Sequence, residues 1–481
     1  MIFRILKNTG YLTISSQAGN LLQFLFFLFV AREFGQGSVG QYAFAFSYTY
    51  IMSVLADLGL AAYMMREVAR DRSGTRQLFA RCLSLRLLAL TFFTGLAVLV
   101  VLVFFKNFRG ETVAIVVLLG FYQLFVSVAD IFLAEFKGHD RMGLVSLLTF
   151  FAKGIIAGGG ILLLLLHFDF LTVLACFPLG ALMYMGLCMI LSSRMFKTIK
   201  PRFRELRLAG LVKDILPFAL AFVFIEALYH LDILMLRFFG TNRAVGVYSA
   251  ANRIILAVLG VNVFVHTAVM PTFSRLFVDS QPQLIDLSKR VLRYLILTGL
   301  PLGVGTFAVA DKIIPVLYST GFGDSIGPLR VLSWTIALGF AAAPFSVLLT
   351  AINRQKEKVL AIGFVLVLNG TLNALLIPGL SAMGAAWAKI AAELVHLVLM
   401  AILVAKYFIL LPLSKILVKP ALSCAAMYIF IRFFPSWNLI VVIPTAIAVF
   451  ALSLAILRGY SREEIEFISG ILRKRFPRPC A

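Results

Sequence analysis

The stretch LRFFGTNRAVGVYSAANR, residues 236–253, repeats an earlier stretch of the same chain, AREFGQGSVGQYAFAF, residues 31–46. In both copies an apolar run ends, an arginine and a Phe-Gly pair follow, and Val-Gly-x-Tyr opens the next apolar run after a short polar turn. Gly40 aligns with Gly246 at an offset of 206 residues. A repeat over this distance indicates that the chain is internally duplicated.

The composition of the 481-residue chain is typical of a membrane protein. Apolar residues make up 61%, charged residues only 14%, and the mean hydropathy is +0.98. A helix needs about 20 apolar residues to cross roughly 30 Å of hydrocarbon, and apolar runs of that length recur from end to end. We therefore expect an all-α polytopic membrane protein without a sizeable soluble domain.

Fourteen transmembrane helices are predicted from these runs. Pro301 lies inside the ninth run, where a membrane helix accommodates it as a kink. The predicted spans are 8–31, 41–65, 82–105, 112–135, 144–166, 170–192, 214–236, 245–270, 291–310, 329–350, 359–378, 383–405, 418–434 and 438–457.

Lysine and arginine are distributed unevenly among the predicted loops. Loops on the side of the N-terminus carry far more of them than loops on the other side, which places both termini in the cytoplasm and the protein in the inner membrane. The formal charge of +22 is then mainly a topology signal, and nucleic-acid binding is not indicated. The five scattered cysteines favour neither a disulfide framework nor a metal site.

The duplication predicts two halves of six spans each, followed by two extra spans. Residues 1–200 would form the N-lobe with spans 1–6, and residues 201–410 the C-lobe with spans 7–12. Because six is even, both copies have the same orientation, which gives parallel repeats with the substrate path between them. Residues 411–481 would add two C-terminal helices and a cytoplasmic amphipathic helix from Ser461 onward.

Two cations lie deep in predicted spans, and each is a candidate substrate ligand. Lys153 lies near the middle of span 5, and Arg253 lies about eight residues into span 8. A charge in hydrocarbon is costly unless it faces water, a partner or a cavity. These two cations could bind a phosphorylated headgroup, since arginine offers a bidentate fork and lysine a point charge. A structural ion pair with a carboxylate of another span is the alternative.

Two other cations in spans favour structural interpretations. Lys389 lies four residues before Glu393 and seven before His396, so a Lys-Glu pair could neutralise itself on one helix face, with substrate binding as the alternative. Arg86 lies one turn into span 3, and we expect it to extend to the lipid headgroups.

Polar residues of span 7 are candidates for binding a coupling ion, either H⁺ or Na⁺. Glu226, His230 and Arg237 are spaced by four and seven residues and therefore form one stripe on the helix. Such a stripe could bind a cation or relay a proton, because His titrates near neutral pH and burial can bring the titration of a Glu toward the same range. A hydrogen-bonded helix contact explains the stripe equally well. Asp232 points away from this stripe, and it joins Asp57 and Glu393 as further acidic candidates.

Uncharged polar residues indicate a lumen. Asn20 and Gln23 of span 1, and Asn369 and Asn373 of span 11, would suit sugar hydroxyls or interhelical hydrogen bonds. Gly40 and Gly246 are expected to serve tight turns at span starts. Tyr42 and Tyr248 would then lie at the outer membrane interface, where aromatic belts occur.

The motif Phe34-Gly35 … Val39-Gly40-x-Tyr42 … Asp57-Leu58-Gly59-Leu60 … Arg66-Glu67, with a second Gly-x-Tyr at span 8, resembles the polysaccharide-transport, or Wzx-type, family of lipid-linked oligosaccharide flippases. This family belongs to the multidrug/oligosaccharidyl-lipid/polysaccharide exporter superfamily. Asp232 also resembles an acidic residue that many members keep near the outer end of this helix. The resemblance implies two six-helix lobes around a central cavity, alternating access between them, and translocation of a polyprenyl-pyrophosphate-linked saccharide toward the periplasm.

Several functions remain open beside that expectation. The others are an ion-coupled drug/cation antiporter, a peptidoglycan-precursor lipid flippase and a membrane scaffold without transport. Residues 71–76, DRSGTR, lack two positions of the major-facilitator loop motif, with Glu67 and Thr75 in place of Gly and Arg. No enzyme, cofactor or metal is indicated. The expected partners are the lipid-linked saccharide, membrane lipids and the polysaccharide polymerase and chain-length machinery, around a monomer.

Overall fold

The computed structural model describes residues 2–57, 59–72, 74–104, 110–196 and 208–460, and within these ranges all regular structure is helical. The expected boundary near residue 200 and the expected helix from Ser461 both lie outside the described residues. Helices form because long apolar runs in lipid must satisfy every backbone N–H and C=O internally.

The N-lobe is built from the first six helices. Its first helix covers two predicted spans and bends at Gly35, where φ is 74° and ψ is −174°. Glycine enters this left-handed region without the clash that a Cβ would cause. The six are α1 (Ile2–Asp57), α2 (Leu60–Arg70), α3 (Thr75–Phe104), α4 (Gly110–Gly138), α5 (Met142–Leu165) and α6 (Phe170–Phe196).

The C-lobe repeats this plan with additions. The predicted span 245–270 is divided in two around Gly260, and two short elements precede the tenth predicted span. The elements are α7 (Leu208–Phe239), α8 (Asn242–Leu259), α9 (Asn262–Asp279), α10 (Gln281–Ala308), α11 (Ala310–Tyr318), the 3₁₀ helix η2 (Thr320–Ser325), α12 (Ile326–Ala351), α13 (Gln355–Leu380) and α14 (Ala382–Tyr407). Two more helices follow, α15 (Leu413–Phe433) and α16 (Leu439–Ile456).

Eleven segments of the described chain are long and apolar enough to cross a membrane. One of them, Gln17–Arg70, contains two predicted spans, while α7, α8 and α9 are not among the eleven. The chain is thus a multi-pass membrane protein, and the count of fourteen stays a prediction.

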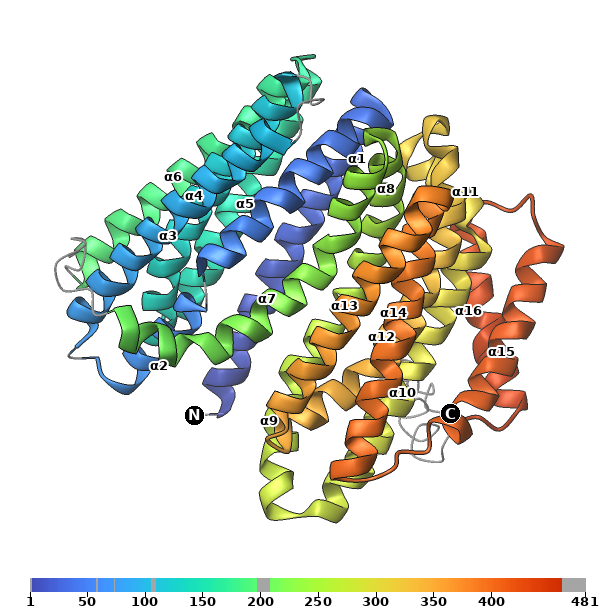
Figure 1. The fold of residues 1–481 in the computed structure, drawn as a ribbon. Coiled ribbons are helices and arrows are strands. Elements are labelled where there is room, and N and C mark those ends of the chain that lie inside the picture. Colours follow the sequence, from blue (N-terminus) through green and yellow to red (C-terminus); the bar gives the residue numbers. More distant parts are fainter. Residues whose placement is uncertain (1, 58, 73, 105–109, 197–207, 461–481) are drawn as a thin grey trace, which may run out of the picture.

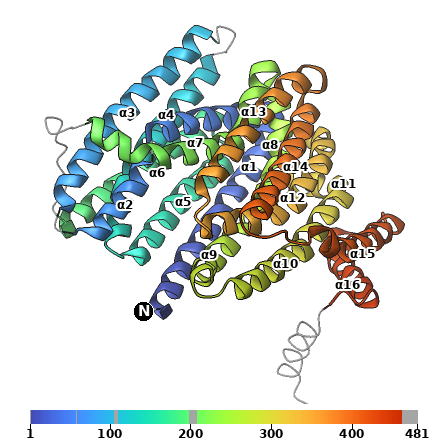
Figure 2. The ribbon, with the colours of Figure 1, turned by 60° about the horizontal axis from the view of Figure 1, so that its bottom comes forward.

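The two lobes lie side by side, with α1, α7 and α8 between them (Figure 1). The largest buried cluster joins both lobes, because it contains Phe27 and Tyr42 of α1 together with Tyr248 and Tyr318 of the C-lobe. The α15–α16 hairpin stands apart from the lobe interface and packs on α10 (Figure 2).

The duplicated motifs contact each other at one end of the lobe interface. A methyl group on Gly40 would overlap the carbonyl oxygen of Asn242 and lie 3.0 Å from the nitrogen of Gly246. A methyl group on Gly246 would in turn overlap the carbonyl oxygen of Gln36. The expectation of tight turns is therefore wrong: both glycines lie within helices and allow α1 and α8 to cross closely.

The two motif tyrosines are also placed differently from the prediction. Tyr42 is 4% exposed and Tyr248 is 0% exposed, so neither lies in an interfacial aromatic belt. Tyr42 packs against Phe177 with ring centroids 5.7 Å apart. The close crossing of α1 and α8 buries both rings in the shared core.

Candidate functional site

A segment of the C-lobe, α11 and η2, bridges the lobes at the end where the duplicated motifs meet. Arg32 of α1 donates from Nε to the carbonyl of Leu317 at 2.8 Å and from Nη2 to that of Val316 at 2.6 Å. These carbonyls end α11, where a cation is favourable. Gln36 donates to the carbonyl of Gly321 at 2.5 Å.

The bridge is anchored further by side chains of both lobes. Arg243 of α8 donates to Gln36 at 3.0 Å and pairs with Asp324 at 2.8 Å. Tyr318 is fully buried, donates to the carbonyl of Ala250 at 3.0 Å and meets Phe27 edge-on. Sequence reasoning missed this segment, although buried Ala310, Ile314 and Tyr318 recur at helical spacing. We call residues 310–325 the bridge segment.

Arg253 extends from α8 of the C-lobe toward α1 of the N-lobe. Its guanidinium carbon lies 4.9 Å from the centre of the Phe27 ring, a cation–π distance. It also lies close to the Tyr42 hydroxyl. The side chain is half-buried, and it forms no ion pair with any carboxylate that the structure describes.

Lys153 of α5, in the N-lobe, also contacts α1. Its Nζ donates to Asn20 Oδ1 at 2.7 Å, and its methylenes lie on Gly19, which has no side chain to obstruct them. Like Arg253, Lys153 forms no ion pair with any carboxylate that the structure describes. Gln23, one turn beyond Asn20, is half-buried.

The two cations therefore reach the same helix from different lobes. Their contacts on α1, Asn20 and Phe27, are seven residues apart, which is about 10 Å along a helix. Gln17, three residues before Asn20, donates to the carbonyl of Gly260 at 3.1 Å, where span 8 is broken. The first half of α1 thus presents polar contacts to both lobes.

A buried polar network occupies the C-lobe. Asp232 is 1% exposed and accepts hydrogen bonds from Tyr248 at 2.9 Å and from Asn373 at 2.8 Å. Lys389 lies 3.3 Å from Asp232 and donates to the carbonyl of Leu228 at 2.7 Å. The expected pair of Lys389 with Glu393 is wrong, because the carboxylate of α7 lies closer than the one on its own helix.

The amides of span 11 belong to the same network. Asn373 also donates to Asn369 at 3.1 Å, and both residues are 0% exposed. In this conformation Asn373 makes an interhelical hydrogen bond to Asp232, Asn369 bonds only to Asn373, and both side chains are buried. Glu393 instead lies 3.4 Å from His396 Nδ1 on its own helix.

The stripe on α7 contacts the N-lobe across the interface. His230 Nδ1 lies 3.0 Å from the Ser47 hydroxyl, and its ring centre is 4.8 Å from that of Tyr50. Glu226 lies close to the Tyr50 hydroxyl. Ser47 is the counterpart of Arg253 in the first copy, so the repeat places different chemistry at equivalent positions.

Asp57 ends α1 and pairs with Arg86 of α3 inside the N-lobe. The Arg86 side chain is only 3% exposed, and its Nε donates to the carbonyl of Ser127 at 3.2 Å. The expectation that Arg86 extends to lipid headgroups is therefore wrong, since the carboxylate of Asp57 satisfies it in the protein.

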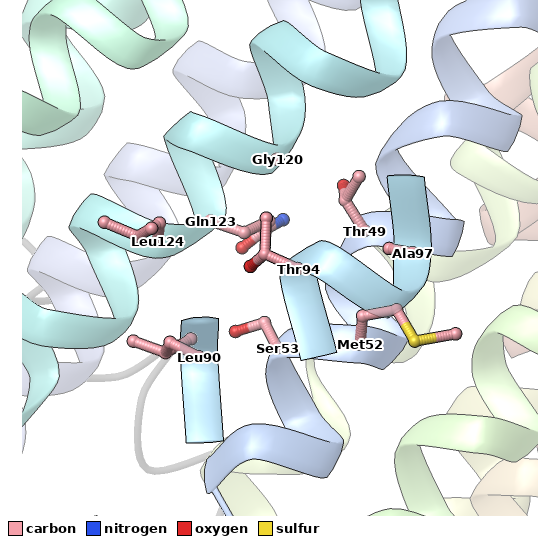
Figure 3. Close-up of a pocket in the computed structure, with 9 residues that line it drawn as sticks. All are labelled: Thr49, Met52, Ser53, Leu90, Thr94, Ala97, Gly120, Gln123 and Leu124. Carbon is pink, nitrogen blue, oxygen red and sulfur yellow. The ribbon is translucent and has the colours of Figure 1, made fainter. Parts of the chain in front are cut away.

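Among the cavities, one of about 10 Å³ lies within the N-lobe between α1, α3 and α4. Figure 3 shows Thr49, Ser53, Thr94 and Gln123 directed toward it. Its volume is about that of one water molecule's probe sphere. Two larger cavities lie elsewhere: about 240 Å³ beside Arg243 and Asp324, and about 460 Å³ in an apolar pocket at residues 410–417.

The family described as "Polysaccharide biosynthesis protein" matches residues 5–277 of the chain. This match spans more than half of the sequence, including both copies of the duplicated motif. The chain belongs to this family. A search of curated proteins found no match.

Solved structures of transporters share the fold of this polysaccharide biosynthesis family member. The lipid II flippase MurJ in an inward closed conformation superimposes with a TM-score of 0.78 at 16% identity, covering 93% of this chain and 98% of that chain. An inward-facing multidrug resistance transporter of the MATE family superimposes with a TM-score of 0.65 at 16% identity, covering 82% of this chain and 96% of that chain. A transporter of the same MOP superfamily from Pyrococcus furiosus superimposes with a TM-score of 0.60 at 16% identity, covering 83% of this chain and 96% of that chain. At this identity the likeness establishes the two-lobed fold.

Proposed function

We propose that this protein moves a polyprenyl-pyrophosphate-linked oligosaccharide, a repeat unit of cell-surface polysaccharide, from the cytoplasmic to the outer leaflet. Family membership and the fold support transport of a lipid-linked saccharide. The observation that carries the proposal is the pair of cations, Arg253 and Lys153, which reach α1 from opposite lobes with no described carboxylate to neutralise them. A pyrophosphate would supply the missing negative charge.

The proposed cycle is alternating access between the lobes. In this proposal both termini lie in the cytoplasm, so the end held by the bridge segment would face outward and the conformation described here would be the one closed to the outside. The pyrophosphate binds Arg253 and Lys153, and Asn20, released from Lys153, binds a sugar hydroxyl together with Gln23. The lipid tail stays in the bilayer. Opening of the bridged end then releases the headgroup.

Coupling to H⁺ or Na⁺ is part of the proposal. Glu226 and His230 face Tyr50 and Ser47 across the interface, so a change in their charge would act where the lobes meet. Glu393, whose side chain is 18% exposed and pairs with His396, is a further candidate in the same lobe. Asp232, Lys389, Asn369 and Asn373 form one buried network that holds the C-lobe together in this state, with Asn369 Nδ2 and Asn373 Oδ1 left unpaired among the described residues. The transporter would act as a monomer beside the polysaccharide polymerase and chain-length machinery.

A drug/cation antiporter is the second candidate, because MATE transporters share the fold. The charges near α1 argue against it. The stretch of α1 before Glu33 contains no carboxylate, and cations contact it at Asn20 and Phe27. A site of this sign attracts an anionic cargo and repels a cationic drug.

Replacing either cation is expected to slow translocation strongly. Purified protein in proteoliposomes would be given a fluorescent saccharide on polyprenyl pyrophosphate, and outer-leaflet label would be followed with an impermeant quencher. Arg253→Ala and Lys153→Ala should each lower the rate at least about tenfold, which corresponds to about 1.4 kcal/mol of lost binding. Arg253→Lys should retain part of the rate, because the charge stays while the fork is lost.

Exposed cations of the same type serve as controls. Arg141→Ala and Lys415→Ala remove exposed charges and should keep the wild-type rate. Wild-type rates for both Arg253→Ala and Lys153→Ala would contradict the proposed site. A fluorescent peptidoglycan-precursor lipid in the same assay tests the alternative cargo. Faster translocation of this lipid than of the lipid-linked oligosaccharide would mean that the protein is a peptidoglycan-precursor flippase.

A further inference from the structure

Phe27 of α1 lies where the proposed cargo cation and the bridge segment meet. Its side chain is 1% exposed, and the guanidinium carbon of Arg253 lies 4.9 Å from the centre of its ring. The Tyr318 ring of the bridge segment meets it edge-on, with ring centroids 6.0 Å apart and an interplanar angle of 89°. One buried ring of the N-lobe thus contacts two different elements of the C-lobe.

Tyr318 also holds the helix that carries Arg253. Its hydroxyl donates to the carbonyl of Ala250 at 3.0 Å, and Ala250 lies three residues before Arg253 on α8. Tyr318 is 0% exposed, whereas Arg253 keeps part of its surface accessible. The bridge segment therefore contacts both supports of Arg253, which are the backbone one turn before it and the ring beside its guanidinium.

The contact with Phe27 orients Arg253 without neutralising it. A cation–π contact engages the face of a ring and occupies no hydrogen-bond acceptor, so the N–H donors of the guanidinium can still bind phosphate oxygens. A side chain that is already fixed in position loses less rotamer freedom when a ligand binds. The Phe27 ring is therefore suited to preparing Arg253 for a phosphate.

The contacts of the bridge segment hold its backbone against the preference of one residue. Ser319, directly after Tyr318, has φ 81° and ψ 172°, a conformation that a residue with a Cβ adopts only where its surroundings impose it. Gly35 of α1 has similar angles, but it lacks the Cβ that causes the strain. Tyr318 and Phe322 on either side of Ser319 are buried and impose its conformation. Loss of their contacts would therefore let the segment rearrange.

We propose that Phe27 is a positioning residue for the cargo: it fixes Arg253 for the phosphate, while the closed bridge segment fixes Phe27 through Tyr318. Opening of the bridged end withdraws Tyr318 from Phe27 and Ala250, so Arg253 loses its fixed position and part of its affinity for phosphate. Coupling between two sites is reciprocal, so a bound phosphate stabilises the closed bridge segment by the same factor. The inference rests on the proposed function and explains why opening at this end would release the headgroup.

Binding of inorganic pyrophosphate tests the positioning role. Isothermal titration calorimetry would use the purified full-length protein in phosphatidylcholine nanodiscs. Phe27→Leu should raise the Kd about fivefold or more, because the cation–π contact is lost. Arg253→Ala should abolish binding. Phe26→Leu is the matched control and should keep the wild-type Kd, since Phe26 is 2% exposed on the same helix but packs on Phe177 of α6, with ring centroids 5.3 Å apart.

The coupling has a separate readout that a purely structural role of Phe27 would not produce. Ala250→Cys places a thiol beside the carbonyl that Tyr318 binds, at a position that is 0% exposed. Saturating pyrophosphate should slow labelling of this thiol by an impermeant maleimide about threefold or more, because it favours the closed segment. Phe27→Leu in the same background should remove this slowing, and Phe26→Leu should retain it.

The outcomes separate this inference from the proposed function. No pyrophosphate binding by the wild type, or binding retained in Arg253→Ala, would refute the cargo site and the inference with it. Binding that depends on Arg253 but is unchanged in Phe27→Leu would refute the positioning role and leave the proposed function standing. Equal slowing of labelling in Phe27→Leu would refute the coupling. If Phe27→Leu fails to fold, Tyr318→Leu removes the same ring contact from the other side and must weaken binding and remove the slowing.

Discussion

Alanine in place of Gly40 is expected to separate the lobes at the bridged end and to abolish transport. The added methyl group would overlap the carbonyl oxygen of Asn242, a backbone atom that no side-chain rotation can move away. Overpacking of this kind costs about 1–3 kcal/mol, so the closed state should lose population by about tenfold or more relative to the open one.

Accessibility of a cysteine at a buried position measures this opening. Ala250→Cys places a thiol where the wild type is 0% exposed, next to the carbonyl that Tyr318 binds. A membrane-impermeant maleimide should label it faster in Gly40→Ala than in the wild type. Gly37 lies three residues away on the same helix, and no atom lies within 4 Å of a methyl group added there. The thiol of Ala250→Cys should therefore label slowly in Gly37→Ala. Equal labelling in both variants would contradict a steric role for Gly40.

Breaking the Asp232–Lys389 pair is expected to destabilise the C-lobe more than any other single substitution considered. Asp232 is 1% and Lys389 14% exposed, so removing either partner leaves a largely buried charge without its counter-ion. Such losses cost about 3–5 kcal/mol. Asp232→Asn and Lys389→Met should therefore each lower the thermal unfolding midpoint of the purified protein markedly.

The double variant distinguishes a structural pair from a coupling site. Asp232→Asn combined with Lys389→Met leaves no unpaired charge, so its midpoint should return more than about half of the way to the wild type. Additive losses in the double variant would show that the two side chains act independently. Lys406→Met, at the far end of the same helix, is the matched control and should leave the midpoint unchanged.

Helix positions were predictable because lipid imposes a local rule on every span. Length and apolarity alone placed most helices, and the repeat around Gly40 and Gly246 indicated two lobes. The breaks at Gly59 and Gly260 were not predicted, although Asp57 and Asn262 beside them make both places less apolar than an unbroken span. The bridge segment was missed because its buried face contacts α1, more than 280 residues earlier.

The candidate site, too, could be predicted from the sequence only in part. Arg253 and Lys153 could be named as candidates because a charge in an apolar run is visible in the sequence itself. The partner of Lys389 was assigned wrongly because i,i+4 spacing is local, whereas Asp232 lies on another helix 157 residues earlier.

The glycine crossing has a further meaning for the origin of the chain. Gly40 packs on the carbonyl of the residue four positions before Gly246, and Gly246 packs on the carbonyl of the residue four positions before Gly40. A contact that is returned by its own counterpart is the mark of an isologous interface, the kind that two identical subunits form about a two-fold axis. The lobe contact thus has the reciprocal form of a homodimer interface, while Arg253 opposite Ser47 is a difference that two identical subunits could not have.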